Sequence, residues 1–508
     1  MNNFFTMLEQ RAQQIPQQVA LIGEHFSLTY EALFARVNTL AKWFQNQKIQ
    51  RAGLWGENSL EWVVADLAAL KAKITLVPLP RFFSEQQLHH IIEEAQLPCI
   101  ITCGNIENII AVKNRVTTPV DHICCDYLES VGAIHSLATI CKITFTSGTT
   151  GAPKGVCLSE LALEKVTQAL AQQIYAAPYA ELEINRHFTL LPLSTLLENI
   201  AGVYVPLYLG KEIVVLSGAT IGLSGSSQLS LPTLLRSLHQ YQPNSLIMLP
   251  QILLGCVVAH AQGFSLPASL KFVAVGGART PVQLLEQAQK VGIPVFEGYG
   301  LSECASVVSL NSPLANKPGS VGKPLSHVRV KIEGGLIKVS GNTFSGYLGH
   351  AEHEQDAWLD TGDLGYLDSE GFLFITGRKK NLLISSFGRN ISPEWVESEL
   401  ALCSSIAQSM VIGDAKEFCS AIIVPASAQT NPADIARDIE HANKKLPDYA
   451  RIKKFIVARQ AFSSTNQLLT DNGRLRRAAI FVAYVDGINE IYASEPSNAH
   501  EGVVYDIF

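Results

Sequence analysis

Short apolar runs alternate with amphipathic stretches through the middle of the chain, and this alternation constrains the fold more than any other feature. The runs have the length and composition of buried β-strands, and the stretches between them have helical spacing. Alternating strands and helices build parallel sheets covered by helices, an α/β architecture. The predicted strands are Lys142 to Thr146, His187 to Leu191, Glu212 to Leu216, Ser245 to Leu249 and Lys271 to Val275, and the predicted helices are Leu158 to Ile174, Pro232 to Gln240 and Pro281 to Val291. Nucleotide sites in such folds lie in loops at the carboxyl ends of the strands.

The pattern changes after about Val328, where predicted strands follow one another without intervening helices. A chain of 508 residues is too long for one hydrophobic core. We therefore predict a large N-terminal domain of helix-covered β-sheets, residues 1–377, and a small α+β C-terminal domain, residues 378–508. The later predicted strands are Val328 to Ile332, Leu336 to Val339, Phe372 to Thr376, Met410 to Ile412 and Ala421 to Val424, and the later predicted helices are Pro393 to Leu400 and Ala433 to Lys445.

Charge and composition exclude several classes of function. The 39 Lys and Arg residues against 45 Asp and Glu residues give a net charge of −6, without the clustered cations that nucleic acid binding requires. The ten cysteines show no zinc-type spacing, so we expect reduced thiols. The N-terminus does not have the pattern of a signal peptide, and the longest helix-like apolar stretch, Ile200 to Gly210, is too short to span a bilayer. We expect a cytoplasmic protein without a transmembrane segment, which leaves open a loose membrane association through an apolar face.

A glycine- and hydroxyl-rich loop, Thr146 to Val156, is the most specific local motif, and it follows a predicted strand and precedes a predicted helix. Its glycines allow a tight turn that aims backbone N–H groups at an anion. Four hydroxyl side chains add donors, and Lys154 adds a positive charge. The loop is not a Walker A motif, because its lysine precedes the glycine rather than Ser or Thr. The alternative is a surface turn without a ligand.

This loop resembles the signature loop of the adenylate-forming superfamily, which includes acyl-CoA synthetases, peptide-synthetase adenylation domains and beetle luciferases. Later segments resemble that family in the same order, from about Phe4 to Ala479. Glu297 to Glu303 is similar to its YGxTE motif, and Thr361 to Asp363 is similar to its TGD motif. The segment from Gly377 to Leu400 is most similar to the fatty-acid branch.

The resemblance implies which residues bind the substrates. It assigns Mg²⁺ to Glu303 and Thr150, a hard-ligand role that suits a carboxylate, and it assigns catalytic roles to Glu303, Lys154 and Arg474. It places a hinge at Lys380, about which the small domain rotates between the two half-reactions. The implied ATP and AMP contacts are Thr146, Ser147, Gly148, Thr149, Thr150, Gly151, Lys154, Gly276, Gly277, Ala278, Glu297, Gly298, Tyr299, Gly300 and Ser302, with Asp363 and Arg378 at the ribose and Gly388 and Arg389 on the side of the thiol acceptor.

Arg474 departs from the family pattern. Most members have a lysine there that contacts both the substrate carboxylate and the α-phosphate. Arginine keeps the charge and binds oxyanions through two nitrogens, but its shape and reach differ. We expect adenylation to survive, because the motifs on the ATP side are intact. The alternatives are an impaired, silent homologue or, for Arg474 itself, a solvated basic cluster.

The segment Leu191 to Glu198 bears on the acid substrate. Amino-acid adenylation domains place an Asp here to bind the substrate ammonium, and this chain has none. A buried ammonium without a counter-charge is costly, so amino acids are disfavoured. Thr195 stands where long-chain synthetases have an aromatic residue or histidine, which would widen the pocket; a helix N-cap is the alternative. The resemblance implies an acid pocket of Thr195, Asn199, Gly277, Tyr299 and Leu301.

The sequence thus predicts an enzyme that uses ATP and Mg²⁺ to activate a carboxylic acid as an acyl-AMP. We expect a fatty acid as the substrate and coenzyme A as the acceptor, with release of AMP and pyrophosphate. One alternative acceptor is the phosphopantetheine of an acyl carrier protein. Another alternative is a catalytically silent protein that binds nucleotide or acyl groups.

Overall fold

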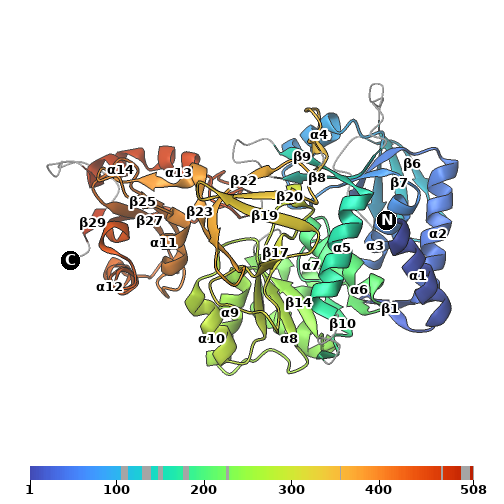
Figure 1. The fold of residues 1–508 in the computed structure, drawn as a ribbon, viewed down its shortest axis with the longest axis horizontal. Coiled ribbons are helices and arrows are strands. Elements are labelled where there is room, and N and C mark those ends of the chain that lie inside the picture. The colour runs from blue at the N-terminus through green and yellow to red at the C-terminus, as the bar shows by residue number, and fades with distance from the viewer. Residues whose placement is uncertain are drawn as a thin grey trace. The chain divides into compact units, whose positions relative to one another are not determined.

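The computed structural model describes residues 1–104, 112–128, 139–146, 153–175, 182–224, 228–354, 356–470, 473–492 and 504–506. The chain forms two compact units (Figure 1). The first contains Met1–Gly277, Gln287–Lys331 and Val339–Leu359, and the second contains Ala278–Glu286, Ile332–Lys338 and Asp360–Phe508. The predicted division near residue 377 stays a prediction.

One sheet of the first unit has eight strands, with parallel pairing at its centre and antiparallel pairing at both edges. β3 (Arg51–Trp55) lies between β4 and β5 and is parallel to both. All of its residues are buried, as expected for a strand covered by other elements on both faces of the sheet. In sheet order the strands are β21 (Gly346–Tyr347), β9 (Lys154–Ser159), β8 (Ile140–Thr146), β4 (Thr75–Pro78), β3 (Arg51–Trp55), β5 (Cys99–Cys103), β7 (Ile123–Leu128) and β6 (Val112–Thr117).

A second sheet of this unit has nine strands. Its middle six strands are parallel, and the strands at its ends are antiparallel to their neighbours. In order they are β18 (Lys323–Pro324), β17 (Ser309–Leu310), β16 (Val295–Tyr299), β15 (Phe272–Val275), β14 (Ser245–Met248), β10 (Arg186–Phe188), β11 (Glu212–Val214), β1 (Val19–Ile22) and β2 (Ser27–Thr29). A short hairpin, β12 (Leu223–Ser224) with β13 (Gln228–Leu229), stands apart.

Helices with clear sequence signals cover these sheets. Thr29 and Ser59 cap the helices that follow them, each accepting a backbone N–H, and Ser84 forms a capping box with Gln87. Apolar residues of the helices capped by Thr29 and Ser59 enter one large buried core, and those of the helix capped by Ser84 enter another. The helices are α1 (Asn2–Gln14), α2 (Tyr30–Asn46), α3 (Leu60–Lys71), α4 (Glu85–Glu94), α5 (Glu160–Tyr175), the π-helix η2 (Glu198–Tyr204), α6 (Val205–Tyr208), α7 (Gly218–Ile221), α8 (Leu231–Tyr241), α9 (Pro250–Ala261), the 3₁₀ turn η3 (Ser302–Cys304) and α10 (Val282–Lys290), which has residues in both units.

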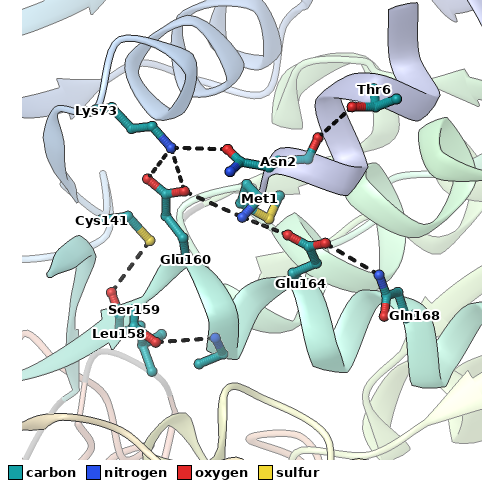
Figure 2. Close-up of polar contacts among 11 residues, drawn as sticks. Met1, Asn2, Thr6, Lys73, Cys141, Leu158, Ser159, Glu160, Glu164 and Gln168 are labelled. Carbon is teal, nitrogen blue, oxygen red and sulfur yellow. Dashed lines mark hydrogen bonds and ion pairs between the residues drawn. The ribbon is translucent and has the colours of Figure 1, made fainter. Parts of the chain in front are cut away.

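Helix α5 is anchored at its start by α1 (Figure 2). Ser159 caps α5, its Oγ accepting the backbone N–H three residues later at 3.2 Å. The ammonium of the buried residue Met1 lies 2.7 Å from Glu164 Oε2 and 3.3 Å from Glu160 Oε2. Lys73 adds a bond of 2.6 Å to Glu160 Oε2. Negative charge in the first turn also complements the helix dipole, so these contacts fix the helix that follows β9.

The second unit has its own cores. In the four-stranded sheet β26–β27–β28–β29, apolar residues pack against the helices at Pro393–Leu400 and Pro432–Asn443 and form one cluster. A second cluster contains residues of the helices at Arg477–Ala483 and Val485–Ile491. The elements of this unit are β23 (Leu373–Arg378), η4 (Lys379–Asn381), β24 (Leu383–Ile384), β25 (Asn390–Ile391), α11 (Pro393–Leu400), β26 (Ile406–Ile412), β27 (Cys419–Pro425), α12 (Pro432–Asn443), η5 (Asp448–Ala450), β28 (Ile452–Val457), α13 (Arg477–Ala483), α14 (Val485–Ile491) and β29 (Val504–Asp506). Three strands have residues in both units: β19 (Val328–Glu333), β20 (Leu336–Gly341) and β22 (Leu359–Leu367).

The predicted architecture is confirmed as mixed α/β, with a large first unit and a smaller second one. Each predicted strand and helix overlaps an observed element of the same type. Among the described residues, no helix combines the length and the apolar character that a bilayer crossing requires.

Candidate active site

The predicted phosphate loop connects two antiparallel strands. β8 pairs with β9, and Thr146 lies opposite Lys154 where the strands meet the connection. Ser147, Gly148, Thr149, Thr150 and Gly151, which we predicted to bind phosphate, lie outside the described residues. The expectation that a helix follows this loop directly is wrong, because β9 follows it and α5 begins only at Glu160. The apolar residues after Lys154 are buried by strand pairing with β8, and the structure fixes the two ends of the loop as neighbours.

Glu303 and Lys154, the predicted magnesium ligand and phosphate-binding cation, meet around one tyrosine. The Tyr347 hydroxyl donates a hydrogen bond of 2.7 Å to Glu303 Oε1. Lys154 Nζ lies 5.6 Å from the centroid of the same ring, within cation–π range. Burial first, and then the bond to Glu303, raise the pKa of Tyr347 well above its ordinary value. The phenol therefore stays a protonated donor at neutral pH.

Two predicted glycine-containing segments meet at the carboxyl ends of parallel strands. β15 and β16 pair with Val275 opposite Glu297, so the turn after β15 lies beside Gly298. A Cβ on Gly276 would lie 3.1 Å from the carbonyl oxygen of Gly298, and Gly277 has a φ of +82°. Both positions therefore favour glycine. The carboxyl end of a parallel sheet is where such folds bind nucleotides; Ala278, the next residue, belongs to the second unit.

The chain turns sharply after Tyr299. A Cβ on Gly300 would lie 1.6 Å from the carbonyl oxygen of Ser306, so no other residue fits this backbone. Tyr299 pairs with Ser309 of β17, and Ser302 begins the 3₁₀ turn η3 that carries Glu303. Tyr299, Leu301, Ser302 and Glu303 are all partly exposed. The segment thus presents side chains to solvent on a backbone that is held tightly.

The predicted acid-pocket segment is shaped by a buried carboxylate. Glu198 Oε1 lies 3.1 Å from His187 Nε2, and its Oε2 accepts the Leu191 backbone N–H at 3.0 Å. Burial raises the pKa of Glu198, while the bond to His187 opposes that rise. Thr195 donates its hydroxyl to the Pro192 carbonyl at 2.6 Å. The pair formed by Glu198 and His187 therefore fixes the turn that carries Thr195.

Asn199 belongs to a different, fully buried network. Its Oδ1 accepts a bond of 2.5 Å from Lys142 Nζ, and its Nδ2 donates to Asp66 Oδ2 at 3.0 Å. Lys142 also binds Asp66 Oδ1 and the Tyr204 hydroxyl, each at 2.7 Å. Both ends of the Asn199 amide are thus occupied, and its side chain is enclosed. We correct our prediction for this residue and leave Asn199 out of the acid pocket.

In the second unit, the two predicted ribose contacts face each other. Asp363 on β22 pairs with Arg378 on β23, and Arg378 Nε lies 2.8 Å from Asp363 Oδ1. Burial first, followed by repulsion from Arg378 and Arg474, lowers the pKa of Lys380. Lys380, the predicted hinge, therefore lies among charged groups of this unit that include Arg378, Arg474, Asp363 and Glu394.

The predicted thiol-acceptor residues form a tight turn between β24 and β25. Gly388 has a φ of +72°, and its N–H bonds to the Ser385 carbonyl at 2.8 Å. The Arg389 N–H bonds to Ser385 Oγ at 3.2 Å. Phe387 at the tip is 73% exposed. The turn thus presents a large apolar ring and a cation to solvent.

Arg474 lies three residues before a partly buried ion pair. Arg477, three residues later, binds Glu397 of α11 through both nitrogens, at 2.8 and 2.5 Å. Glu397 Oε1 also accepts the Val411 backbone N–H at 2.7 Å. Arg474 itself lies in a turn in which its N–H bonds to Thr470 Oγ1 at 3.0 Å. The pair between Arg477 and Glu397 therefore anchors the segment that carries Arg474.

The donor set fits a magnesium ion that arrives with its nucleotide. The described residues hold no group of three or more His, Cys, Asp or Glu side chains that could bind a metal alone. Mg²⁺ is usually held by one or two carboxylates together with substrate phosphates, and Glu303 can supply one carboxylate. Thr150, the other predicted ligand, lies outside the described residues.

Sequence reasoning did not identify Tyr347 or the role of His187. Tyr347 lies in a two-residue strand, and His187 lies at the start of a predicted strand. Neither position has a local sequence pattern that marks it as part of a polar site. The signal that could have found Tyr347 is the pair of glycines around it, Gly346 and Gly349, both with positive φ.

Models of known families match most of the chain. The AMP-binding enzyme model matches residues 8–340, and the model of the AMP-binding enzyme C-terminal domain matches residues 380–496. The chain belongs to the AMP-binding enzyme family. It is thus an adenylate-forming enzyme of the AMP-forming acid–thiol ligase class, and the resemblance seen in the sequence is confirmed.

Individual relatives are similar over nearly their whole length. A 2-succinylbenzoate–CoA ligase of Bacillus subtilis is 28% identical, with 91% of this chain and 96% of the relative covered. A long-chain-fatty-acid–CoA ligase of Mycobacterium bovis is 23% identical, with 88% of each chain covered. The structure of the O-succinylbenzoate coenzyme A synthetase of Bacillus subtilis with AMP matches with a TM-score of 0.73 at 25% identity, covering 93% of this chain and 97% of that one.

Proposed function

We propose that this enzyme uses Mg-ATP to convert a carboxylic acid to an acyl-AMP and then transfers the acyl group to coenzyme A. The observation that carries this proposal is the meeting of Glu303 and Lys154 around Tyr347. A cation and a carboxylate beside the end of the glycine-rich connection suit a triphosphate and its metal. Relatives named as acid–CoA ligases support the same reaction.

Each predicted residue has a role that its chemistry suits. Lys154 would offset negative charge on the departing pyrophosphate, and Glu303 would supply a hard oxygen ligand to Mg²⁺, which would neutralise phosphate charge when bound. Asp363 accepts the ribose hydroxyls, and Arg474 binds the substrate carboxylate and the α-phosphate through parallel N–H donors. Most of the rate enhancement then comes from positioning and charge stabilisation.

We further propose that the small domain turns about Lys380 between the two half-reactions, with its boundary near residue 377. In this proposal Arg474 serves adenylation, and the turn with Gly388 and Arg389 serves thiol transfer. The match to the C-terminal domain model begins at residue 380, which supports a boundary and a hinge at this position.

For the acid, we propose a substrate with an apolar body and one carboxylate, such as a fatty acid. The segment Leu191 to Gly210 contains no Lys or Arg, and its one charge, Glu198, is bonded to His187. A second substrate carboxylate would find no cation in this segment. An apolar pocket with few polar groups suits an aliphatic or aryl chain. Thr195 and Leu301, both partly exposed, remain our proposed contacts, with Gly277 and Tyr299.

A second candidate substrate is 2-succinylbenzoate. The similarity to 2-succinylbenzoate–CoA ligases over more than nine-tenths of the chain favours it. The two candidates differ in charge, because 2-succinylbenzoate has a second carboxylate that needs a partner.

The test is acid-dependent exchange of pyrophosphate with ATP, measured with fatty acids of graded length and with 2-succinylbenzoate. We expect exchange with at least one of these acids, and AMP release when coenzyme A is added. Exchange with AMP release only onto an acyl carrier protein would replace the acceptor that we propose. ATP binding without exchange for every acid would contradict the reaction itself.

A further inference from the structure

Tyr347 lies on a short segment that connects two parts of the site. The strand β21 pairs antiparallel with β9, with Tyr347 opposite Val156. The backbone of Leu348 also donates to the Gly155 carbonyl at 2.8 Å. On the other side, the Phe344 N–H bonds to the backbone carbonyl of Glu303 at 2.7 Å. The segment therefore holds the start of β9, next to Lys154, at a fixed position relative to η3.

The tyrosine ring itself has a defined orientation. Phe344 packs edge-on against it, with ring centroids 4.9 Å apart, and His350 approaches at 6.3 Å. Its hydroxyl reaches Glu303 Oε1 at 2.7 Å, and its ring is within range of Lys154 Nζ. A single side chain thus contacts both groups that we assign to the metal and the phosphates.

The hydrogen bond engages only half of the carboxylate. Glu303 Oε2 has no protein partner in the described part of the chain, whereas Oε1 is held by Tyr347. A carboxylate held through one oxygen presents the other in a fixed direction, which is how partners of metal ligands orient them.

We propose that Tyr347 is a positioning residue that aims Glu303 Oε2 at the nucleotide-bound Mg²⁺. This inference rests on the function proposed above, in which Glu303 binds that ion. The hydroxyl fixes the orientation of the Glu303 carboxylate, while the ring contacts Lys154 through a cation–π interaction. Loss of the hydroxyl alone should therefore weaken the metal dependence and leave packing and the lysine contact in place.

Tyr347→Phe is the test, because phenylalanine keeps the ring and removes only the hydroxyl. The first readout is the affinity for ATP, measured by titration calorimetry with and without Mg²⁺. We expect the gain in affinity that Mg²⁺ gives the wild-type protein to fall by about 10-fold, as for lost partners of metal ligands. The second readout is the Mg²⁺ concentration that gives half-maximal pyrophosphate exchange, which should rise in the same variant.

Two further variants separate a metal-aiming role from a structural one. Tyr366→Phe removes a hydroxyl from an exposed tyrosine of the second unit and should change neither readout. Glu303→Gln should lower the gain from Mg²⁺, and adding Tyr347→Phe to it should have no further effect, because the two residues act as one unit. Additive losses would overturn the inference, as would an unchanged Mg²⁺ dependence in Tyr347→Phe.

The outcome is separable from a failure of the proposed function. If the wild-type protein shows neither Mg²⁺-dependent ATP binding nor exchange, the proposed function fails. If it shows both, and Tyr347→Phe folds and binds with wild-type Mg²⁺ dependence, only the role of Tyr347 is rejected.

Discussion

Lys142 and Asp66 form an ion pair of 2.7 Å in which neither side chain is exposed to solvent. The pair is completed by Tyr204, which donates to Asp66 Oδ2 at 2.6 Å, and by Asn199. It joins β8, which leads to the phosphate loop, to α3 and to the π-helix η2. An intact buried ion pair has little net effect on stability, but removal of one partner leaves the other charge buried without a counter-charge.

We predict that Lys142→Met destabilises the protein by about 3–5 kcal/mol, the typical cost of an uncompensated buried charge. Urea unfolding followed by circular dichroism measures the change. The double variant Lys142→Met with Asp66→Leu removes both charges and should recover much of the loss. A single variant as stable as the wild-type protein would contradict the arrangement.

The Lys142 network also shows where prediction from the sequence ends. Strand and helix positions follow from apolar periodicity, which is local, so the strand that contains Lys142 and most of helix α5 were predicted correctly. Asn199 was assigned to the acid pocket through the family resemblance. Its partners, Lys142 and Asp66, come from distant segments, and no local pattern identifies them.

The same distinction applies to the site. The motifs assign Gly276, Gly298 and Gly300 to nucleotide binding, which stays a prediction, and close backbone approaches explain why these positions favour glycine. Tyr347 was missed because its role depends on the pairing of β21 with β9. The β8–β9 hairpin was missed because the apolar residues after Lys154 run directly into a helix, and periodicity does not mark the boundary between them.

Gly300→Ala should abolish Mg-ATP binding or folding of the first unit. The added Cβ would lie 1.6 Å from the Ser306 carbonyl oxygen, so the backbone beside Glu303 must move. Calorimetric ATP titration together with thermal unfolding measures both effects. Gly255→Ala is the matched control, because its Cβ meets nothing closer than 3.5 Å inside helix α9. At position 255, alanine should stabilise the folded protein by about 0.5–1 kcal/mol. If the two variants had the same ATP affinity and thermal stability, the close approach between Gly300 and the Ser306 carbonyl would be contradicted.

His327 should make stability depend on pH in the acid range. Burial first, helped by repulsion from Lys165, lowers its pKa from 6.5 to about 4. Between these two pH values the imidazole is protonated in the unfolded chain and neutral in the folded protein. The free energy of unfolding is therefore highest above pH 6.5 and decreases as the pH falls towards 4. The total loss is about 3 kcal/mol. Urea unfolding midpoints measured across this pH range should fall less for His327→Gln than for the wild-type protein. His89 is exposed, so His89→Gln should show the same pH dependence as the wild-type protein.

Arg474 should act in adenylation through its charge. Arg474→Ala should lower acid-dependent exchange by about 10²–10³-fold, the usual cost of removing one donor to a developing anion. Arg474→Lys keeps the charge, and we expect it to retain exchange. A large gain of activity in Arg474→Lys over a nearly inactive wild-type protein would instead identify a silent homologue.

The most direct test of the reaction is acid-dependent exchange of labelled pyrophosphate into ATP by the wild-type protein, followed by AMP release on addition of coenzyme A. We predict exchange with an acid of apolar body, its loss in Glu303→Gln, and AMP release only when coenzyme A is present. ATP binding without exchange for any fatty acid or for 2-succinylbenzoate would contradict the assignment of Glu303, Lys154 and Arg474 to acyl-AMP formation.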